Sequence, residues 1–145
     1  MQSGAPQAIP VLNQYLLDVS FENPAAKFAR VRGEQPVIDK SVDVAAALRP
    51  DGHYNVDLRL LVSVSANGAD LFLVEATYRC VCDVTGLAGD DLERRLLIEG
   101  GAHMYPAARN LVAGLVGEGG YSPTLTLDPV DFEAVYGQGA ARAPL

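Results

Sequence analysis

The chain has 145 residues, 49% of them hydrophobic, which suits one ordinary domain with a sizeable core. Its 11 basic and 18 acidic residues give a net charge of −7, and no Lys or Arg cluster occurs, so nucleic acid is not an expected partner. No apolar run of about 18 residues occurs, and residues 1–14 lack the pattern of a secretory signal, which predicts a cytoplasmic chain without direct membrane insertion.

The first predicted strand runs from Val11 to Glu22 and includes the sequence YLLDVSFE. Successive side chains of a strand point to opposite faces. One face would carry Tyr15, Leu17, Val19 and Phe21, and the other would carry Leu16, Asp18, Ser20 and Glu22. Two carboxylates beside an exposed leucine are unusual for a purely solvated face, so this outward row is a candidate contact surface.

Three further segments alternate with a period of two, at about residues 37–48, 53–66 and 71–84. The last of them places Phe72, Val74, Ala76, Tyr78, Cys80 and Cys82 on one face, and Leu71, Leu73, Glu75, Thr77, Arg79 and Asp83 on the other. Turn-forming residues separate the segments at 33–36, 50–52 and 67–68. Connections this short favour antiparallel neighbours, so the four strands are predicted to form a meander.

Helical patterns follow Gly89. Asp90 and Asp91 favour the start of a helix that Gly100-Gly101 would interrupt, and a second helix would open near Tyr105-Pro106 and end at the glycines of 117–120. A third, short helix would have Asp128 as its N-cap and Pro129 at its first position.

The predicted fold class is therefore α+β, a four-stranded antiparallel meander sheet followed by C-terminal helices packed on one face. We expect a single domain over residues 1–145, with an ordered core from about 9 to 136 and flexible tails. The outward sheet face, with Leu16, Leu61, Leu71 and Leu73 among its charges, would have no cover within one chain. An uncovered face and two open sheet edges indicate association with other chains.

The sequence contains no catalytic signature that would indicate an enzyme. There is no G-x-S-x-G motif, and the glycines of 114–120 end a helix instead of opening one. Cys80 and Cys82 are expected to be reduced core thiols, and His53 and His103 are too distant in the sequence to complete a metal site with them. We therefore expect no enzymatic activity, metal or cofactor.

Several phrases, in one order and at one spacing, resemble the SecB family, the cytosolic chaperones of bacterial protein export. They are DVSFENP at 18–24, YNVDLRL in the third strand, and the stretch from Tyr105 to Tyr136. The resemblance implies a homotetramer, built as a dimer of dimers, that holds unfolded preproteins in long hydrophobic grooves without ATP. It also implies delivery of these preproteins to the translocation ATPase SecA.

The same resemblance implies roles for particular residues. The family's acidic SecA-contact patch maps onto Asp18, Glu22, Leu73 and Glu75, and its tetramer-sensitive positions map onto Val74, Ala76 and Tyr78. Tyr105 and Tyr121 are expected to be aromatic contacts in the groove for client polypeptides. The chain departs from the family pattern at residues 79–82, at Gly100-Gly101, at Lys40 and in its C-terminal tail, which lacks the acidic or basic extension that some members use as a second SecA contact.

Other readings are a small domain that binds an apolar ligand, a purely structural oligomer, or a SecB-like chaperone repurposed for a toxin-antitoxin client. A closed pocket with a few convergent polar groups would favour the first of these, and long open grooves would favour a chaperone.

Overall fold

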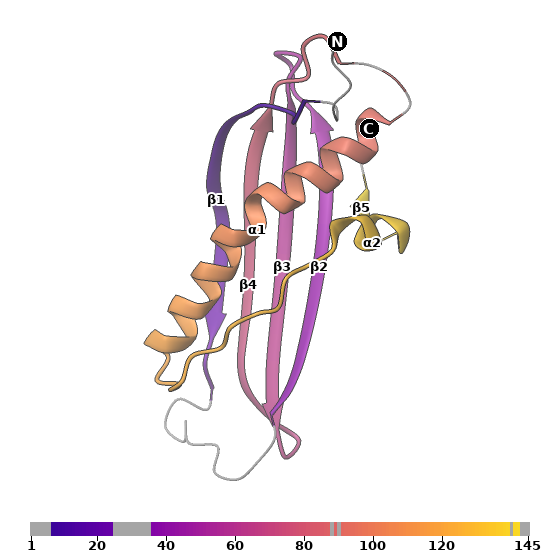
Figure 1. The fold of residues 1–145 in the computed structure, drawn as a ribbon. Coiled ribbons are helices and arrows are strands. Elements are labelled where there is room, and N and C mark those ends of the chain that lie inside the picture. The colour runs from indigo at the N-terminus through magenta and orange to yellow at the C-terminus, as the bar shows by residue number, and fades with distance from the viewer. Residues whose placement is uncertain (1–6, 25–35, 88, 90, 140, 143–145) are drawn as a thin grey trace.

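The structure, a computed structural model, describes residues 7–24, 36–87, 89, 91–139 and 141–142. Its elements, in chain order, are β1 (Val11–Glu22), β2 (Val37–Leu48), β3 (Tyr54–Ala66), β4 (Ala69–Cys82), α1 (Leu92–Glu118), α2 (Phe132–Gly137) and β5 (Ala141–Arg142). Figure 1 shows α1 crossing the sheet obliquely, and the segment after it returning across the same face to α2 beside β2. The α+β class with an antiparallel four-stranded sheet and C-terminal helices is confirmed.

The strand order is β1-β4-β3-β2-β5, which corrects the predicted meander. β2, β3 and β4 are consecutive neighbours, but β1 pairs with β4 instead of β2. The turn between β3 and β4 is formed by Asn67 and Gly68, whose positive φ angles of 53° and 77° match a two-residue hairpin turn. Most of the predicted turn at 33–36 lies outside the described residues.

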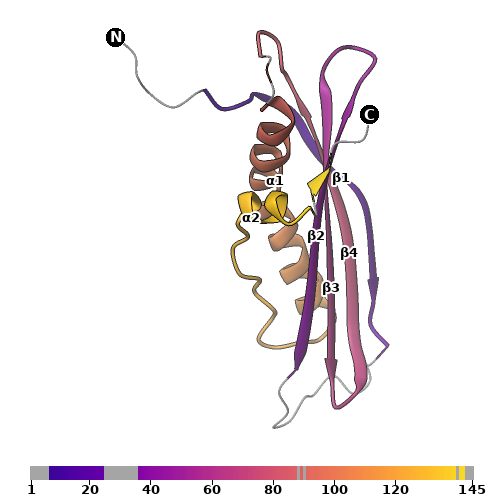
Figure 2. The same cartoon turned by 90° about the vertical axis from the view of Figure 1, so that its right-hand side faces the viewer.

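The core lies between the sheet and α1. Along β3 the side chains of Val56, Leu58, Leu60, Val62 and Val64 alternate without a break and are all buried. Each such burial contributes about 1.5–3 kcal/mol relative to an exposed side chain. Figure 2 shows both helices on this one side of the sheet. We call the helix-covered side the inner face and the opposite side the outer face.

α1 is one continuous helix of 27 residues, so the predicted interruption at Gly100-Gly101 is wrong. A β-carbon on Gly100 would lie 2.8 Å from Val56 Cγ1, and one on Gly101 would lie 2.6 Å from Phe132 Cδ1. The two glycines therefore let the helix approach β3 and α2 closely. Pro106, expected in a first turn, also lies inside α1. Tertiary packing outweighs the low helix propensity of these residues.

α2 begins later than the sequence predicts. Its N-cap is Asp131, whose carboxylate accepts hydrogen bonds from the backbone N–H groups of Glu133 and Ala134, so the prediction of Asp128 as the cap is wrong. The C-terminal tail was expected to be flexible, yet Ala141 and Arg142 form β5 parallel to β2. The β2 edge is therefore partly paired, whereas no strand among the described residues pairs with the outer edge of β1.

Candidate functional site

An apolar groove of about 300 Å³ lies at one end of the inner face, beneath the segment that follows α1. We call it the loop groove. It is lined by Pro36, Ile38, Val64, Leu71, Phe72, Val116, Tyr121, Ser122, Pro123, Thr124 and Leu125. Of the predicted groove residues, Tyr121 is therefore present. Ile38 is 45% exposed, so this apolar lining reaches the surface.

Tyr121 is fixed in the groove by contacts on two sides. Its hydroxyl oxygen lies 2.8 Å from Asn23 Oδ1 and 3.2 Å from the carbonyl oxygen of Leu71. Its ring packs on Phe72, with 4.9 Å between the ring centroids. Partial burial raises the pKa of Tyr121, so the hydroxyl stays neutral at physiological pH. The groove wall is therefore a held aromatic surface.

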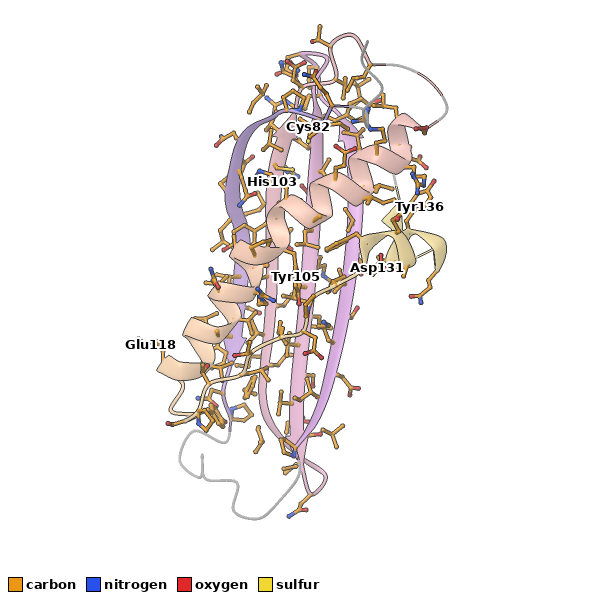
Figure 3. All side chains as sticks on the ribbon, viewed as in Figure 1. Cys82, His103, Tyr105, Glu118, Asp131 and Tyr136 are labelled. Carbon is orange, nitrogen blue, oxygen red and sulfur yellow. The ribbon has the colours of Figure 1, made fainter. Side chains whose placement is uncertain are left out.

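Tyr105, the second predicted groove residue, is not among the side chains that line the groove. It is 5% exposed, and its hydroxyl donates a hydrogen bond of 2.6 Å to the carbonyl oxygen of Asp128. Its ring meets Phe132 edge to face, and Lys40 and Arg109 each place a cationic group within 6 Å of the ring centroid. Figure 3 shows Tyr105 over the middle of the sheet. The structure gives it a role in anchoring the returning segment.

Sequence reasoning missed several groove residues. Leu71 was expected on the outer face, but the register of β4 shifts next to it and Leu71 packs into the core beside Phe72. A one-residue irregularity of this kind reverses the face of a side chain. The contributions of Ile38 and Leu125 depend on the path of the returning segment, for which the sequence carries no periodic signal.

The predicted acidic patch is assembled on the outer face. Asp18, Glu22, Leu73 and Glu75, which we call the outer patch, lie on the adjacent strands β1 and β4. The register pairs Glu22 with Leu73, and Ser20 with Glu75, so the four residues share one face and one region of it. Arg59 on β3 also reaches this region, and its Nε lies 2.6 Å from Glu75 Oε2. This hydrogen bond raises the pKa of the Arg59 guanidinium above its ordinary value.

Leu16 is not part of that row, contrary to the prediction from alternation. The β1–β4 register shifts between Leu16 and Asp18, which leaves Leu16 opposite Tyr78 and Asp18 opposite Thr77. Tyr78 belongs to the inner face, where its hydroxyl donates to the carbonyl oxygen of Ala107 on α1. Leu16 therefore faces the helix side, and Tyr15, opposite Arg79, faces outward.

Val74, Ala76 and Tyr78 lie on the inner face, as the alternation of β4 predicts. Val74 and Ala76 are fully buried within this single chain, and Tyr78 is partly buried against α1. Exposed apolar side chains occur instead on β1, which carries five of the eight large exposed hydrophobic residues among those described. They are Leu12, Tyr15, Leu16, Leu17 and Val19. The unpaired sheet edge is thus also an apolar one.

Comparison with known proteins identifies the family. A family model described as preprotein translocase subunit SecB matches residues 2–143. The protein-export protein SecB of Caulobacter vibrioides is 41% identical over 136 residues, which cover 93% of this chain and 83% of that protein. The chain belongs to the SecB family. The protein-export protein SecB of Hyphomonas neptunium is 37% identical over 144 residues, covering 98% of this chain and 84% of its own length.

A solved SecB-like structure has the same fold. It is the SecB-like chaperone of Mycobacterium tuberculosis in complex with a ChAD peptide from an antitoxin, with a TM-score of 0.66 and 18% sequence identity. The match covers 85% of this chain and 91% of that one. The resemblance of this chain to the protein-export chaperones of the SecB family, inferred from its sequence phrases, is confirmed.

Two further features bear on this SecB-family member. Within the described residues, no helix combines the length and apolarity needed to cross a membrane. In the same part of the chain, no three His, Cys, Asp or Glu side chains are grouped as a metal site would require.

Proposed function

We propose that this SecB-family chain is a cytoplasmic holdase that binds unfolded preproteins without ATP and without a catalytic step. The observation that carries the proposal is the loop groove, an apolar channel that opens to the surface at Ile38. Extended segments of an unfolded client carry apolar side chains, and each one buried in such a groove contributes about 1.5–3 kcal/mol. Several weak apolar contacts of this kind together hold a client polypeptide, and they require no particular amino-acid sequence in the client.

The loop groove is open and has few convergent polar groups, which favours a polypeptide over a small apolar ligand. The aromatic side of Tyr121 offers a large contact area with little loss of freedom, because its hydroxyl and ring are already held. The net charge of −7 keeps a loaded complex dispersed by mutual repulsion.

We propose a homotetramer, a dimer of dimers, as the working form. The exposed apolar side chains and unpaired edge of β1 support this assembly, because a second copy would cover both. Val74 and Ala76 would act on assembly through the packing of α1, since both are buried within one chain. Tyr78, which contacts the backbone of α1, would act in the same way.

We propose that the outer patch binds a basic surface of SecA. Its three carboxylates and Leu73 lie together on a face without a helix over it in the described residues. Charges at the rim of an interface mainly set association rate and salt dependence, and a central leucine supplies desolvated contact. An antitoxin is a second candidate client, favoured by the antitoxin peptide held in the Mycobacterium tuberculosis structure.

The test is suppression of aggregation. The purified protein is mixed, without ATP, with a slowly refolding preprotein diluted from denaturant, and light scattering is followed. The proposal predicts reduced scattering and a stable complex in gel filtration. A small apolar ligand that binds while scattering is unchanged would support the small-ligand alternative instead.

A further inference from the structure

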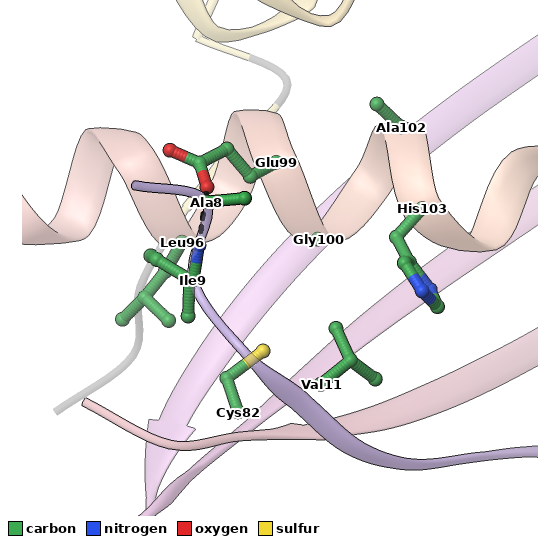
Figure 4. A pocket seen from close by; sticks show the side chains of 9 residues that line it. All are labelled: Ala8, Ile9, Val11, Cys82, Leu96, Glu99, Gly100, Ala102 and His103. Carbon is green, nitrogen blue, oxygen red and sulfur yellow. Dashed lines mark hydrogen bonds between the residues drawn. The ribbon is translucent and has the colours of Figure 1, made fainter. Parts of the chain in front are cut away.

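A second cavity, of about 460 Å³, lies at the other end of the inner face and is unrelated to the loop groove. Residues 8–11 form one wall, and residues 96–103 of α1 form another. Figure 4 shows Cys82 on its sheet side, facing the helix that carries Glu99 and His103. We call it the strap cavity, because the backbone N–H of Ile9 donates to Glu99 Oε1 at 2.8 Å and so ties the N-terminal segment to α1.

The wall of the strap cavity holds one member of a thiol pair. Cys80 and Cys82 are free, buried, and both on the inner face of β4. Their Sγ atoms are 3.8 Å apart, close enough for one thiol to donate a weak hydrogen bond to the other. Cys82 lines the cavity and Cys80 does not. A small molecule in the cavity therefore meets Cys82 first, with Cys80 directly beside it.

We propose that Cys82 is an oxidative modification site for small hydroperoxides and that Cys80 is its resolving thiol. The Cys82 thiolate attacks the distal peroxide oxygen, the O–O bond breaks, and the electron pair leaves with the second oxygen as hydroxide or alkoxide, which takes up a proton. Cys82 is then a sulfenic acid. The Cys80 sulfur next attacks the Cys82 sulfur, water leaves, and a disulfide forms. The two thiols lose two electrons, and the peroxide gains them.

The electrostatic surroundings support this order of events. The hydrogen bond between the two thiols lowers the pKa of Cys82 and raises the pKa of Cys80. Burial raises the pKa of Cys80 further. Burial and the nearby carboxylate of Glu99 both act against the thiolate of Cys82. His103, on the same cavity wall, has its Nδ1 2.7 Å from Gln14 Oε1. Because Cys82 lines the cavity and Cys80 does not, Cys82 is the member of the pair that a peroxide reaches, and its thiolate is the nucleophile.

Oxidation would change the sheet locally. Residues two apart on a strand have Cα atoms about 6.6 Å apart, near the upper end of the disulfide range of about 4.4–6.8 Å. Closing the bridge therefore shortens β4 where Cys80 faces Gln14 and Cys82 faces Val11 on β1. Strained disulfides of this kind are readily reduced. The predicted result is a reversible loosening of the N-terminal half of β1.

The experiment treats the native full-length protein with hydrogen peroxide and follows free thiols, intact mass and peptide maps. The expected result is loss of both thiols, one Cys80–Cys82 disulfide per chain, and recovery with dithiothreitol. In Cys80→Ser, dimedone should trap a sulfenic acid at Cys82, and in Cys82→Ser, Cys80 should give at least about tenfold less adduct. Hydrogen exchange should become faster at residues 11–14 on oxidation and stay unchanged at 19–22.

The control is the same chain unfolded in urea, in which both thiols must react. If the folded wild-type protein keeps both thiols while the unfolded chain loses them, the two residues are inert core thiols and the proposal is overturned. Equal dimedone adducts in the two serine variants would overturn the assignment of Cys82 as the attacking thiol. Circular dichroism checks both variants, and alanine replaces serine in any variant that does not fold.

Discussion

Arg59 and Glu75 form an ion pair across β3 and β4, with Arg59 Nε 2.6 Å from Glu75 Oε2. One of the three carboxylates of the outer patch therefore has a cationic partner on the same chain. Arg59 also lies 4.0 Å from Asp43 on β2. We infer that Asp18 and Glu22, for which no such partner occurs among the described residues, supply most of the negative charge that the patch presents.

This pairing predicts opposite effects for two variants on SecA binding. Asp18→Asn combined with Glu22→Gln should weaken binding by about 0.4–2 kcal/mol, at about 0.2–1 kcal/mol for each exposed charge. Arg59→Gln should strengthen binding, because it releases Glu75. Titration at low and high salt measures both effects, and Asp51→Asn in the β2–β3 turn is the control with one charge removed elsewhere. Equal SecA affinity in all variants at both salt concentrations would reduce the patch to a solvated face.

The loop groove predicts a difference between the two tyrosines. Tyr121→Ser removes an aromatic wall of the groove. The lost apolar contact, about 1.5–3 kcal/mol of binding free energy, should weaken the binding of client peptides by about tenfold or more. Tyr105→Phe, the matched variant outside the groove, loses two hydrogen bonds of the hydroxyl, the one donated to the carbonyl oxygen of Asp128 and a long one accepted from Lys40 Nζ. It should lower the free energy of unfolding by about 1 kcal/mol and leave peptide affinity unchanged. Fluorescence anisotropy with a labelled unfolded peptide compares them, and the reverse ranking would relocate the groove.

The glycines of α1 give a prediction about stability. Gly101→Ala places a β-carbon 2.6 Å from the Phe132 ring, so we expect a loss of about 1–3 kcal/mol in the free energy of unfolding. Gly114→Ala, in the same helix, meets nothing within 4 Å and should gain about 0.5–1 kcal/mol. Urea unfolding measures both. A neutral Gly101→Ala would mean that α1 and α2 are not closely packed there.

The exposed edge of β1 gives a prediction about assembly. Leu12→Lys combined with Leu17→Lys places two charges on this edge, where a second chain would have to desolvate them. Sedimentation should show a tetramer for the parent and smaller species for the variant, with unchanged circular dichroism. Leu48→Lys, at a 63% exposed position at the end of β2, should stay tetrameric. A tetrameric double variant would exclude β1 as the assembly edge.

Much of the fold could be predicted because the strands alternate strongly. The five inward residues of β3 from Val56 to Val64 form an unbroken apolar row, and the turn at Asn67-Gly68 carries the residues that its positive φ angles need. Alternation also placed Asp18, Glu22, Leu73 and Glu75 on one face.

The errors have physical causes that lie outside the local sequence. The register shift near Leu17 reverses the faces of Tyr15 and Leu16, and the shift at Leu71 reverses the face of Leu71 itself. No residue pattern marks either shift. In the sequence, Gly100-Gly101 is typical of a helix break. In the structure, the two glycines lie within the helix because it packs closely against Val56 and Phe132 there. The partner of β1 is decided by long-range pairing with β4, since short turns constrain only consecutive strands.

The most direct test of the central claim, that the loop groove holds unfolded clients, is aggregation suppression by matched variants. An unfolded preprotein is diluted from denaturant without ATP into the parent protein, Tyr121→Ser or Tyr105→Phe, and light scattering is recorded. The account predicts suppression by the parent protein and by Tyr105→Phe, and clearly weaker suppression by Tyr121→Ser at the same oligomeric state. Scattering that the folded parent protein does not reduce would contradict it.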